Sequence, residues 1–485
     1  MAQHPGFHSL RDEAAASLSV EGSLPPWLTG SLVRNGPGAF SFPDGSAVDH
    51  WFDGLAMLYR FTFDPEAGEV HYRNRFLRTD AYEAARTGEF DGGFATGETT
   101  LRSRLATFLT DPYDNTNIIV ERVGDEFLAL TESPRWVVVD PDSLATTGHV
   151  TYEGSAPSGQ LSCAHFKRDP ATGRLLNVAT EFGRTSTYHI YAMDGAQDRF
   201  HVGSVDTDSP AYMHSFAITP RYVVLTEFPL RLDPRRFLKP GRQAPFIEQF
   251  EWEPDRGTRV IVVDRTTGET VAAPTAEPIF GFHHVNAFER AGGDEIVFDL
   301  ETVPDATTID SLYLDELRAG DLDTLAGQLD RFTVSLDGDG RYGPGDATVE
   351  RETLYDAGTA LPTVSPARWC RRHRYVYAMS MDQPASGWAH GVLRIDTDTG
   401  EAIEFRRGAD YFGEPIFVPD PEGDAEDDGV VVSVALDEGA DVSRLVVLDG
   451  STLAERARVT LPHQVPFDFH GRYFPGVRVA DSGSK

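Results

Sequence analysis

The chain of 485 residues carries a formal net charge of −33, with 40% apolar and 11% aromatic residues. This composition supplies a large hydrophobic core, which excludes a disordered chain, and the charge argues against general binding to nucleic acid. The sequence lacks both the run of about 20 apolar residues that a membrane span needs and a secretory signal pattern, and its two cysteines do not make a disulfide framework, so we expect a cytoplasmic protein.

Short β-rich segments alternate with turns rich in Gly, Asp and Pro along most of the chain. In chain order they include residues 126–140, 216–228, 259–271, 374–381, 391–405, 429–436 and 444–459. Strands that recur about every ten residues indicate an all-β sandwich, barrel or propeller. Clear helical periodicity is confined to stretches such as residues 310–322, DSLYLDELRAGDL, so we expect only a few short helices.

One hairpin pattern recurs, in which an apolar strand ends in Asp and a turn leads into a second strand. It occurs at residues 138–150, 262–271, 394–405 and 447–459. Irregular repetition of one hairpin is typical of propeller blades that carry insertions. We predict a single β-propeller domain over residues 1–485, with tails at 1–15 and 478–485. A tandem sandwich is the alternative, but no Pro/Ser-rich boundary supports it.

Basic residues are mostly arginine, because only three of the 43 are lysines. An acidic surface with more arginine than lysine is similar to that of proteins from salt-loving microbes, where charge keeps the protein in solution. This pattern indicates a salt-rich solvent and gives no information about the reaction or ligand of the protein.

Four of the fifteen histidines are closely flanked by aromatic or apolar residues, namely His165, His214, His283 and His470. Taken singly, each fits a core histidine whose two nitrogens are hydrogen-bonded. Their spacing suggests one histidine per blade, and the innermost strands of a propeller all face its axis. An all-nitrogen shell suits Fe, Cu, Ni or Zn and not Ca or Mg. The spacing does not choose among these metals.

Several motifs in the same order resemble those of the carotenoid cleavage oxygenases. They are residues 22–38 (GSLPPWLTGSLVRNGPG), 49–63 (DHWFDGLAMLYRFTF), the four histidine segments, 413–421 (GEPIFVPDP) and 467–476 (FDFHGRYFPG). The resemblance implies a seven-bladed β-propeller with short helices and loops over its active-site face. It also implies one Fe(2+) per chain on the axis, bound by His165, His214, His283 and His470. His284, on the other side of its strand, is expected to be structural.

The resemblance also implies three glutamates that accept the second N–H of a metal-bound histidine. Glu132 and Glu414 match two of them, and we pair Glu132 with His214 and Glu414 with His470. The third position is Ala360, so His283 is expected to lack its usual carboxylate, and a water, another acid or a backbone carbonyl must replace it. Thr131 matches a threonine beside the open coordination positions of the iron; the alternative is an ordinary strand threonine.

The function that the resemblance implies is an iron(II) dioxygenase that uses O₂ to cleave a conjugated double bond of a carotenoid or apocarotenoid, giving aldehyde or ketone products. Cleavage of a stilbene-type olefin is a close alternative, and isomerohydrolase activity on a retinoid ester a more distant one. A carotenoid-binding propeller with impaired catalysis is a further alternative, for which Ala360 is the first evidence.

Residues 227–250, EFPLRLDPRRFLKPGRQAPFIEQF, combine apolar side chains with five basic ones. The basic residues are Arg231, Arg235, Arg236, Lys239 and Arg242. Basic residues beside exposed apolar ones suit docking on an anionic membrane surface, which would give access to an apolar polyene. The alternative is a loop whose arginines pair with the acidic surface.

Overall fold

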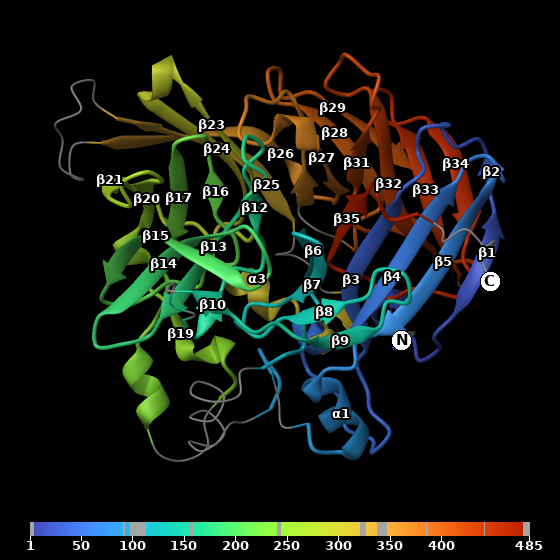
Figure 1. The fold of residues 1–485 in the computed structure, drawn as a ribbon, viewed down its shortest axis with the longest axis horizontal. Coiled ribbons are helices and arrows are strands. Elements are labelled where there is room, and N and C mark those ends of the chain that lie inside the picture. The colour runs from blue at the N-terminus through green and yellow to red at the C-terminus, as the bar shows by residue number, and fades with distance from the viewer. Residues whose placement is uncertain are drawn as a thin grey trace.

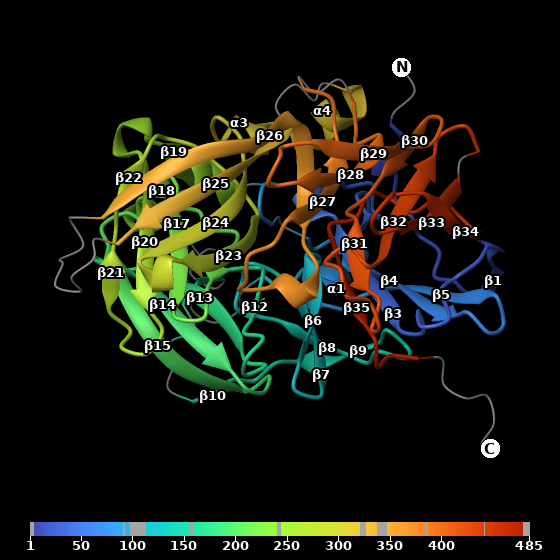
Figure 2. The ribbon, with the colours of Figure 1, turned by 90° about the horizontal axis from the view of Figure 1, so that it is seen from above.

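The computed structural model describes residues 4–90, 93–97, 113–154, 157, 159–239, 244–320, 326–336, 347–383, 387–440 and 442–478. Its sheets follow one another around a common centre in chain order, so that the first sheet contains strands from both ends of the chain (Figures 1 and 2). Five sheets of four to six strands each form one blade, and a seven-stranded sheet forms two more. The expected seven-bladed β-propeller is therefore confirmed.

The first blade closes the ring, because the last strand of the chain pairs antiparallel with β3, with His470 opposite Asn35. Its strands, in sheet order, are β1 (Ala15–Ser19), β5 (Glu69–Phe76), β4 (Leu55–Asp64), β3 (Ser31–Ala39) and β35 (His470–Phe474). Burial alternates along β5, as expected of a strand with one face in the core, whereas β3 is buried throughout.

Three blades follow from the next third of the chain. The first comprises β6 (Ile119–Val123), β7 (Glu126–Leu130), β8 (Val137–Val139) and β9 (Thr146–His149). The second comprises β10 (Glu153–Gly154), β11 (Leu161–Ser162), β12 (Lys167–Arg168), β13 (Leu175–Glu181), β14 (Ser186–Met193) and β15 (Asp198–Thr207). The third comprises β16 (Ala217–Ile218), β17 (Tyr222–Glu227), β20 (Thr258–Asp264), β21 (Thr270–Ala272) and β22 (Thr275–Ala276). A separate ribbon pairs β18 (Leu230–Leu232) with β19 (Phe250–Trp252).

The long strand β26 joins two neighbouring blades into one sheet. The sheet comprises β23 (His284–Arg290), β24 (Glu295–Thr302), β25 (Gly327–Ser335), β26 (Thr348–Thr363), β27 (Tyr375–Ser380), β28 (Gly391–Asp396) and β29 (Ala402–Arg406). The last blade comprises β2 (Glu21–Gly22), β30 (Asp410–Phe412), β31 (Ile416–Pro419), β32 (Gly429–Asp437), β33 (Val442–Asp449) and β34 (Glu455–Thr460).

The recurrent hairpins share one turn, and the aspartate that ends the strand organises it. The carboxylate accepts N–H groups two or three residues further on, and the residue four positions on is left-handed and donates to the aspartate carbonyl. This holds for Asp140 with Leu144, Asp264 with Gly268, Asp396 with Gly400 and Asp449 with Leu453, and also for Asp169 with Gly173. An aspartate that hydrogen-bonds backbone two residues ahead stabilises such turns, which explains the recurrent sequence pattern.

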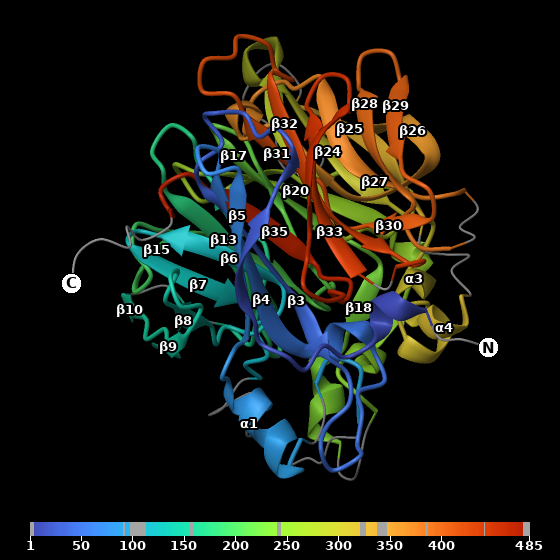
Figure 3. The same cartoon turned by 90° about the vertical axis from the view of Figure 1, so that its right-hand side faces the viewer.

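Within the described residues, helices are few and short, as expected, and lie outside the blades (Figure 3). They are α1 (Asp80–Thr87), α3 (Thr307–Asp310) and α4 (Leu314–Ala319), with 3₁₀ turns at Pro5–Phe7, Trp51–Asp53, Pro234–Leu238, Ile247–Gln249, Pro254–Arg256, Ala291–Gly293 and Pro366–Arg368. Of the helix expected over residues 310–322, the structure forms the part in α4 and, at Asp310, the end of α3, because the chain is extended at Tyr313 and Gly320 ends α4 in a left-handed conformation; residues 321 and 322 lie outside the described residues. In the described ranges, no helix is long and apolar enough to cross a membrane.

The amino-terminal segment differs from the expected tail over residues 1–15. Phe7 is fully buried and its ring packs against Trp51, Trp388 and Phe467. Burial of one phenylalanine stabilises by roughly 1.5–3 kcal/mol, which is why this segment lies against the blades from His4 onward. Of the expected tail at the other end, residues 479–485 lie outside the described residues.

Candidate metal centre and cavity

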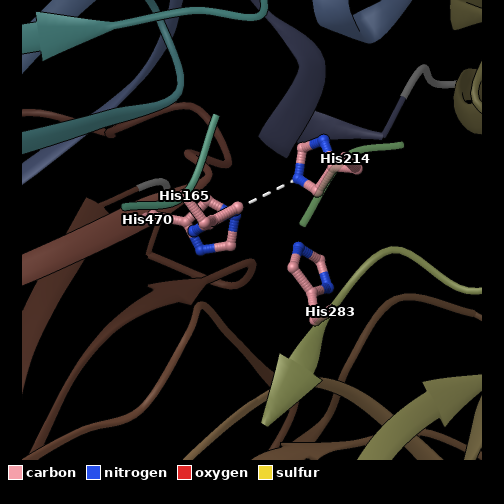
Figure 4. A group of neighbouring side chains, drawn as sticks. All are labelled: His165, His214, His283 and His470. Atoms are coloured by element: carbon pink, nitrogen blue, oxygen red, sulfur yellow. Dashed lines mark hydrogen bonds between the residues drawn. The ribbon is translucent and has the colours of Figure 1, made fainter. Parts of the chain in front are cut away.

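Four histidines from distant parts of the chain meet at the centre of the ring. His165 lies between β11 and β12, His214 precedes β16, His283 directly precedes β23, and His470 begins β35. Each offers a ring nitrogen, and these four nitrogens all lie within 4.8 Å of one another. The rings face a common point, and the Nε2 atoms of His165 and His214 are 3.1 Å apart (Figure 4). The structure therefore brings together all four of the residues that were predicted as ligands.

Two of these histidines are oriented by the expected glutamates. The Nδ1 of His214 donates to Glu132 Oε1 at 2.6 Å, and the same oxygen accepts the hydroxyl of Tyr212 at 2.7 Å. The Nδ1 of His470 donates to Glu414 Oε1 at 2.8 Å, while the other carboxylate oxygen accepts the N–H of Gly471 at 2.7 Å. Both contacts fix Nδ1 as the protonated nitrogen and leave Nε2 for the centre.

His283 lacks the carboxylate at position 360, as expected, and of the three expected replacements (a water, another acid or a backbone carbonyl) the structure has another acid. Its Nδ1 lies 2.9 Å from Glu301 Oε2, on the neighbouring strand β24. Ala360 does lie near the site, where it lines the adjoining cavity, but the acid comes from another strand. Sequence reasoning missed Glu301, although the acid interrupts the apolar run "IVFDLETV", which was the available signal.

His284 has the structural role that was expected. It is buried, its Nδ1 is 2.9 Å from the Ser215 hydroxyl and its Nε2 is 2.8 Å from the Thr226 hydroxyl. With both ring nitrogens hydrogen-bonded, His284 has no nitrogen left for a ligand.

The electrostatics of the centre favour neutral imidazoles. Burial, followed by the neighbouring histidines, holds the pKa of His165 and His283 well below the usual value, and burial also lowers the pKa of His470. The Nε2 of His283 is buried without a hydrogen-bond partner. A buried polar atom without a partner is costly, and neutral imidazole nitrogens are the form that binds transition metals. The four residues therefore fit a metal ion.

An apolar cavity of about 500 Å³ ends at this centre, and its lining includes His214, His283, His470, Thr131 and Glu132. Many of the other lining residues are large and apolar, among them Trp51, Phe52, Phe94, Phe237, Phe246, Phe282, Leu312, Met379, Met381, Trp388 and Phe469. Its volume lies in the range of small-molecule sites. Residues of α1 and α3 also line it, so the helices cover this face.

A second cavity, of about 1030 Å³, reaches His165, His283 and His470 and has a more polar lining. It includes Lys167, whose ammonium donates to the backbone carbonyl of His284 at 2.9 Å. The two cavities have only His283, Leu361 and His470 in common among their lining residues. The centre is thus bordered by one apolar and one polar space.

Residues 227–250 differ from the expected mixture of exposed apolar and basic side chains. Arg231 is buried and paired with Glu227 at 2.7 Å, and most of the apolar residues lie in the core, namely Phe228, Leu230, Leu232, Phe237 and Ile247. Leu238 is 67% exposed, and the exposed Arg235 pairs with Asp233 at 2.8 Å. Arg242 lies outside the described residues.

Comparison with known proteins gives the class of the chain. A family model described as "retinal pigment epithelial membrane protein" matches residues 7–475, and the chain belongs to this family.

Individual relatives are enzymes by name. The chain is 32% identical over 489 residues to carotenoid cleavage dioxygenase 8 homolog A, chloroplastic, of Oryza sativa, covering 96% of this chain and 87% of the relative. It is 32% identical over 468 residues to the apocarotenoid-15,15'-oxygenase of Synechocystis, covering 94% and 92%. A solved structure of cobalt-substituted Synechocystis apocarotenoid oxygenase is 29% identical with a TM-score of 0.84, covering 97% and 98%.

Proposed function

We propose that the protein is a non-haem iron(II) dioxygenase that cleaves one conjugated double bond of a carotenoid or apocarotenoid with O₂, giving aldehyde or ketone products. The observation that carries this proposal is the meeting of four buried imidazoles at the end of an apolar cavity. His165, His214, His283 and His470 would hold one Fe(2+) per chain, and relatives named as carotenoid and apocarotenoid oxygenases support the choice of substrate.

When bound, iron(II) supplies the activation of O₂, and the residues of the chain supply the rest. Four neutral imidazoles bring no negative charge, so the ion would keep its full charge for O₂. Glu132, Glu301 and Glu414 hold three of the rings in one orientation through their Nδ1–H groups.

The cavity would place the substrate. Aromatic and thioether side chains bind a long conjugated chain through its apolar surface and exclude water. Thr131 lines the cavity next to Glu132, where its side chain would border the reacting bond. Orientation of one double bond beside the ion is the main contribution that such a cavity makes to rate.

The alternative of a binding protein with impaired catalysis loses its first evidence, because Glu301 occupies the place of the acid that Ala360 does not provide. Cleavage of a stilbene-type olefin would use the same centre, and substrate trials separate it from polyene cleavage.

The test is to reconstitute the protein anaerobically with Fe(II) and to add apocarotenals, carotenoids and stilbenes under ¹⁸O₂. We expect cleavage of a polyene with label in both carbonyl products, and no cleavage by the matched His214→Ala variant. Iron-loaded protein that leaves every polyene intact would contradict the proposal.

We further propose that the protein is cytoplasmic and contacts a membrane surface near Leu238, because the flanking segment lines the apolar cavity through Phe237 and Phe246. Leu238 is exposed beside Arg235 and Arg236, whose side chains pair with Asp233 and Glu251, so shallow insertion into a membrane surface would depend mainly on the leucine. A polyene could then pass from the lipid into the cavity.

A further inference from the structure

We propose that Glu301 is a positioning residue of the metal centre, which orients His283 and performs from β24 the task that the resemblance assigns to position 360 on β26. This inference rests on the proposed function, since it concerns the same ion. It adds a residue for which the sequence motifs gave no role.

The sheet itself sets Glu301 beside His283. The N–H of Glu301 donates to the His283 carbonyl at 3.1 Å, so the two residues are opposite one another at the start of the antiparallel β23–β24 pair. Opposite residues of antiparallel strands project to the same face. The Glu301 carboxylate therefore reaches His283 Nδ1, at 2.9 Å, directly across the pair.

The neighbouring strand leaves space for this side chain. A Cβ atom at Gly327, on β25, would lie 2.9 Å from Glu301 Cγ and 3.2 Å from Glu301 Oε1, which is closer than ordinary contact. Any larger residue at position 327 would push the carboxylate away from His283. The position of the Glu301 side chain therefore depends on the glycine at position 327.

Glu301 and Leu361 both line the apolar cavity beside the centre. Leu361 has a φ of +48°, a conformation that L-residues avoid at a cost of about 1–2 kcal/mol. Leu361 and His283 are two of the three residues that line both cavities. Glu301 thus orients His283 at the point where the two spaces meet.

The surroundings of Glu301 do not explain the acid in another way. Its side chain is 11% exposed, and within the described part of the chain no lysine or arginine pairs with it. A buried carboxyl group without a cation is unfavourable. The hydrogen bond from His283 instead connects Glu301 to the metal centre.

The test compares Glu301→Gln, Glu301→Ala and the double variant Glu301→Ala/Ala360→Glu with the wild type, using Glu289→Ala as the matched control on the outer part of β23. Bound iron is measured against a competing chelator, and the visible spectrum of the Co(II)-loaded protein reports on ligand geometry. We expect Glu301→Ala to bind iron about 10–100-fold more weakly with a changed cobalt spectrum. We expect the double variant to recover most of the affinity, and the control to match the wild type.

Iron affinity and a cobalt spectrum equal to wild type in Glu301→Ala would overturn the inference and leave the proposed function intact. If the double variant does not regain iron affinity, the inference that a glutamate at position 360 can replace the glutamate at position 301 is wrong. If the Ala variant does not fold, Glu301→Gln decides, because its neutral amide keeps the size of the side chain but is a weaker acceptor for the His283 Nδ1–H and must weaken binding. Absence of iron binding in the wild type would instead refute the proposed function.

Discussion

The side chain of Arg34, on β3, links this strand to Asp468 near the start of β35. Substitution of Arg34 therefore tests how the ring is closed beside the metal centre. Its side chain is fully buried, and its guanidinium donates to both Asp468 oxygens, at 2.6 and 2.5 Å. It also donates to the Glu414 carbonyl at 3.0 Å and lies 3.8 Å from the Glu414 carboxylate. One cation thus compensates two buried acids, one of which orients His470.

Substitution of Arg34 by Met keeps most of the volume but leaves both acids without their cation. Removal of one partner of a buried ion pair costs about 3–5 kcal/mol, because an uncompensated charge remains. We expect the free energy of unfolding in urea to fall by about 4 kcal/mol. In the double variant Arg34→Met/Asp468→Leu only Glu414 stays uncompensated, so part of this loss should be recovered.

The matched control is Arg458→Met, which breaks exposed ion pairs to Glu21 and Glu455. Exposed pairs contribute under about 1 kcal/mol, so this variant should unfold near the wild-type midpoint. A loss below about 1 kcal/mol in Arg34→Met, equal to that of the control, would refute the reasoning.

The remaining predictions concern metal, pH and lipid. Chelation of iron should lower the thermal midpoint of the wild type, since a ligand bound only by the folded state stabilises it, and should leave that of His214→Ala unchanged; equal shifts in both would contradict the assignment of the ligands. Burial raises the pKa of Asp53 to about 6, above the unfolded value near 3.9. Folding therefore favours the protonated carboxyl group. The contribution of this group to the free energy of unfolding is present below about pH 4 and is lost as the pH rises through 6. The unfolding free energy of the wild type, relative to Asp53→Asn, should therefore fall by about 3 kcal/mol between pH 4 and 7, and a flat difference would contradict this. Arg235→Gln/Leu238→Gln should bind anionic liposomes more weakly at unchanged iron content, and undiminished binding would exclude this contact.

The fold and most of the centre could be predicted because the relevant signals are local in sequence. The aspartate turn leaves its pattern within five residues, and a histidine among aromatics is conspicuous wherever it falls. Glu132 and Glu414 could be paired with their histidines because motifs carried them. The spacing of the four histidines suggested one histidine per blade, and the innermost strand of each blade faces the axis, so the four rings could be expected to meet there.

The rest depends on contacts between segments that no local pattern reports. Glu301 reaches His283 across a strand pair, and its place depends on the glycine at position 327 of the next strand. Phe7 is buried only because rings from three distant segments lie beside it. Arg231 was expected to belong to a basic surface segment. It is instead buried, because it forms an ion pair with Glu227, four residues earlier in the chain.

Closure of the ring by β35 has a consequence for the order of events during synthesis. The strand that pairs with β3 begins with His470, so a nascent chain that has not yet emerged to this point can supply only three of the four imidazoles. Metal binding at full affinity must then wait until the chain has emerged beyond His470 and β35 has paired with β3. A chain that stopped before His470 would leave both an open propeller and an incomplete coordination set.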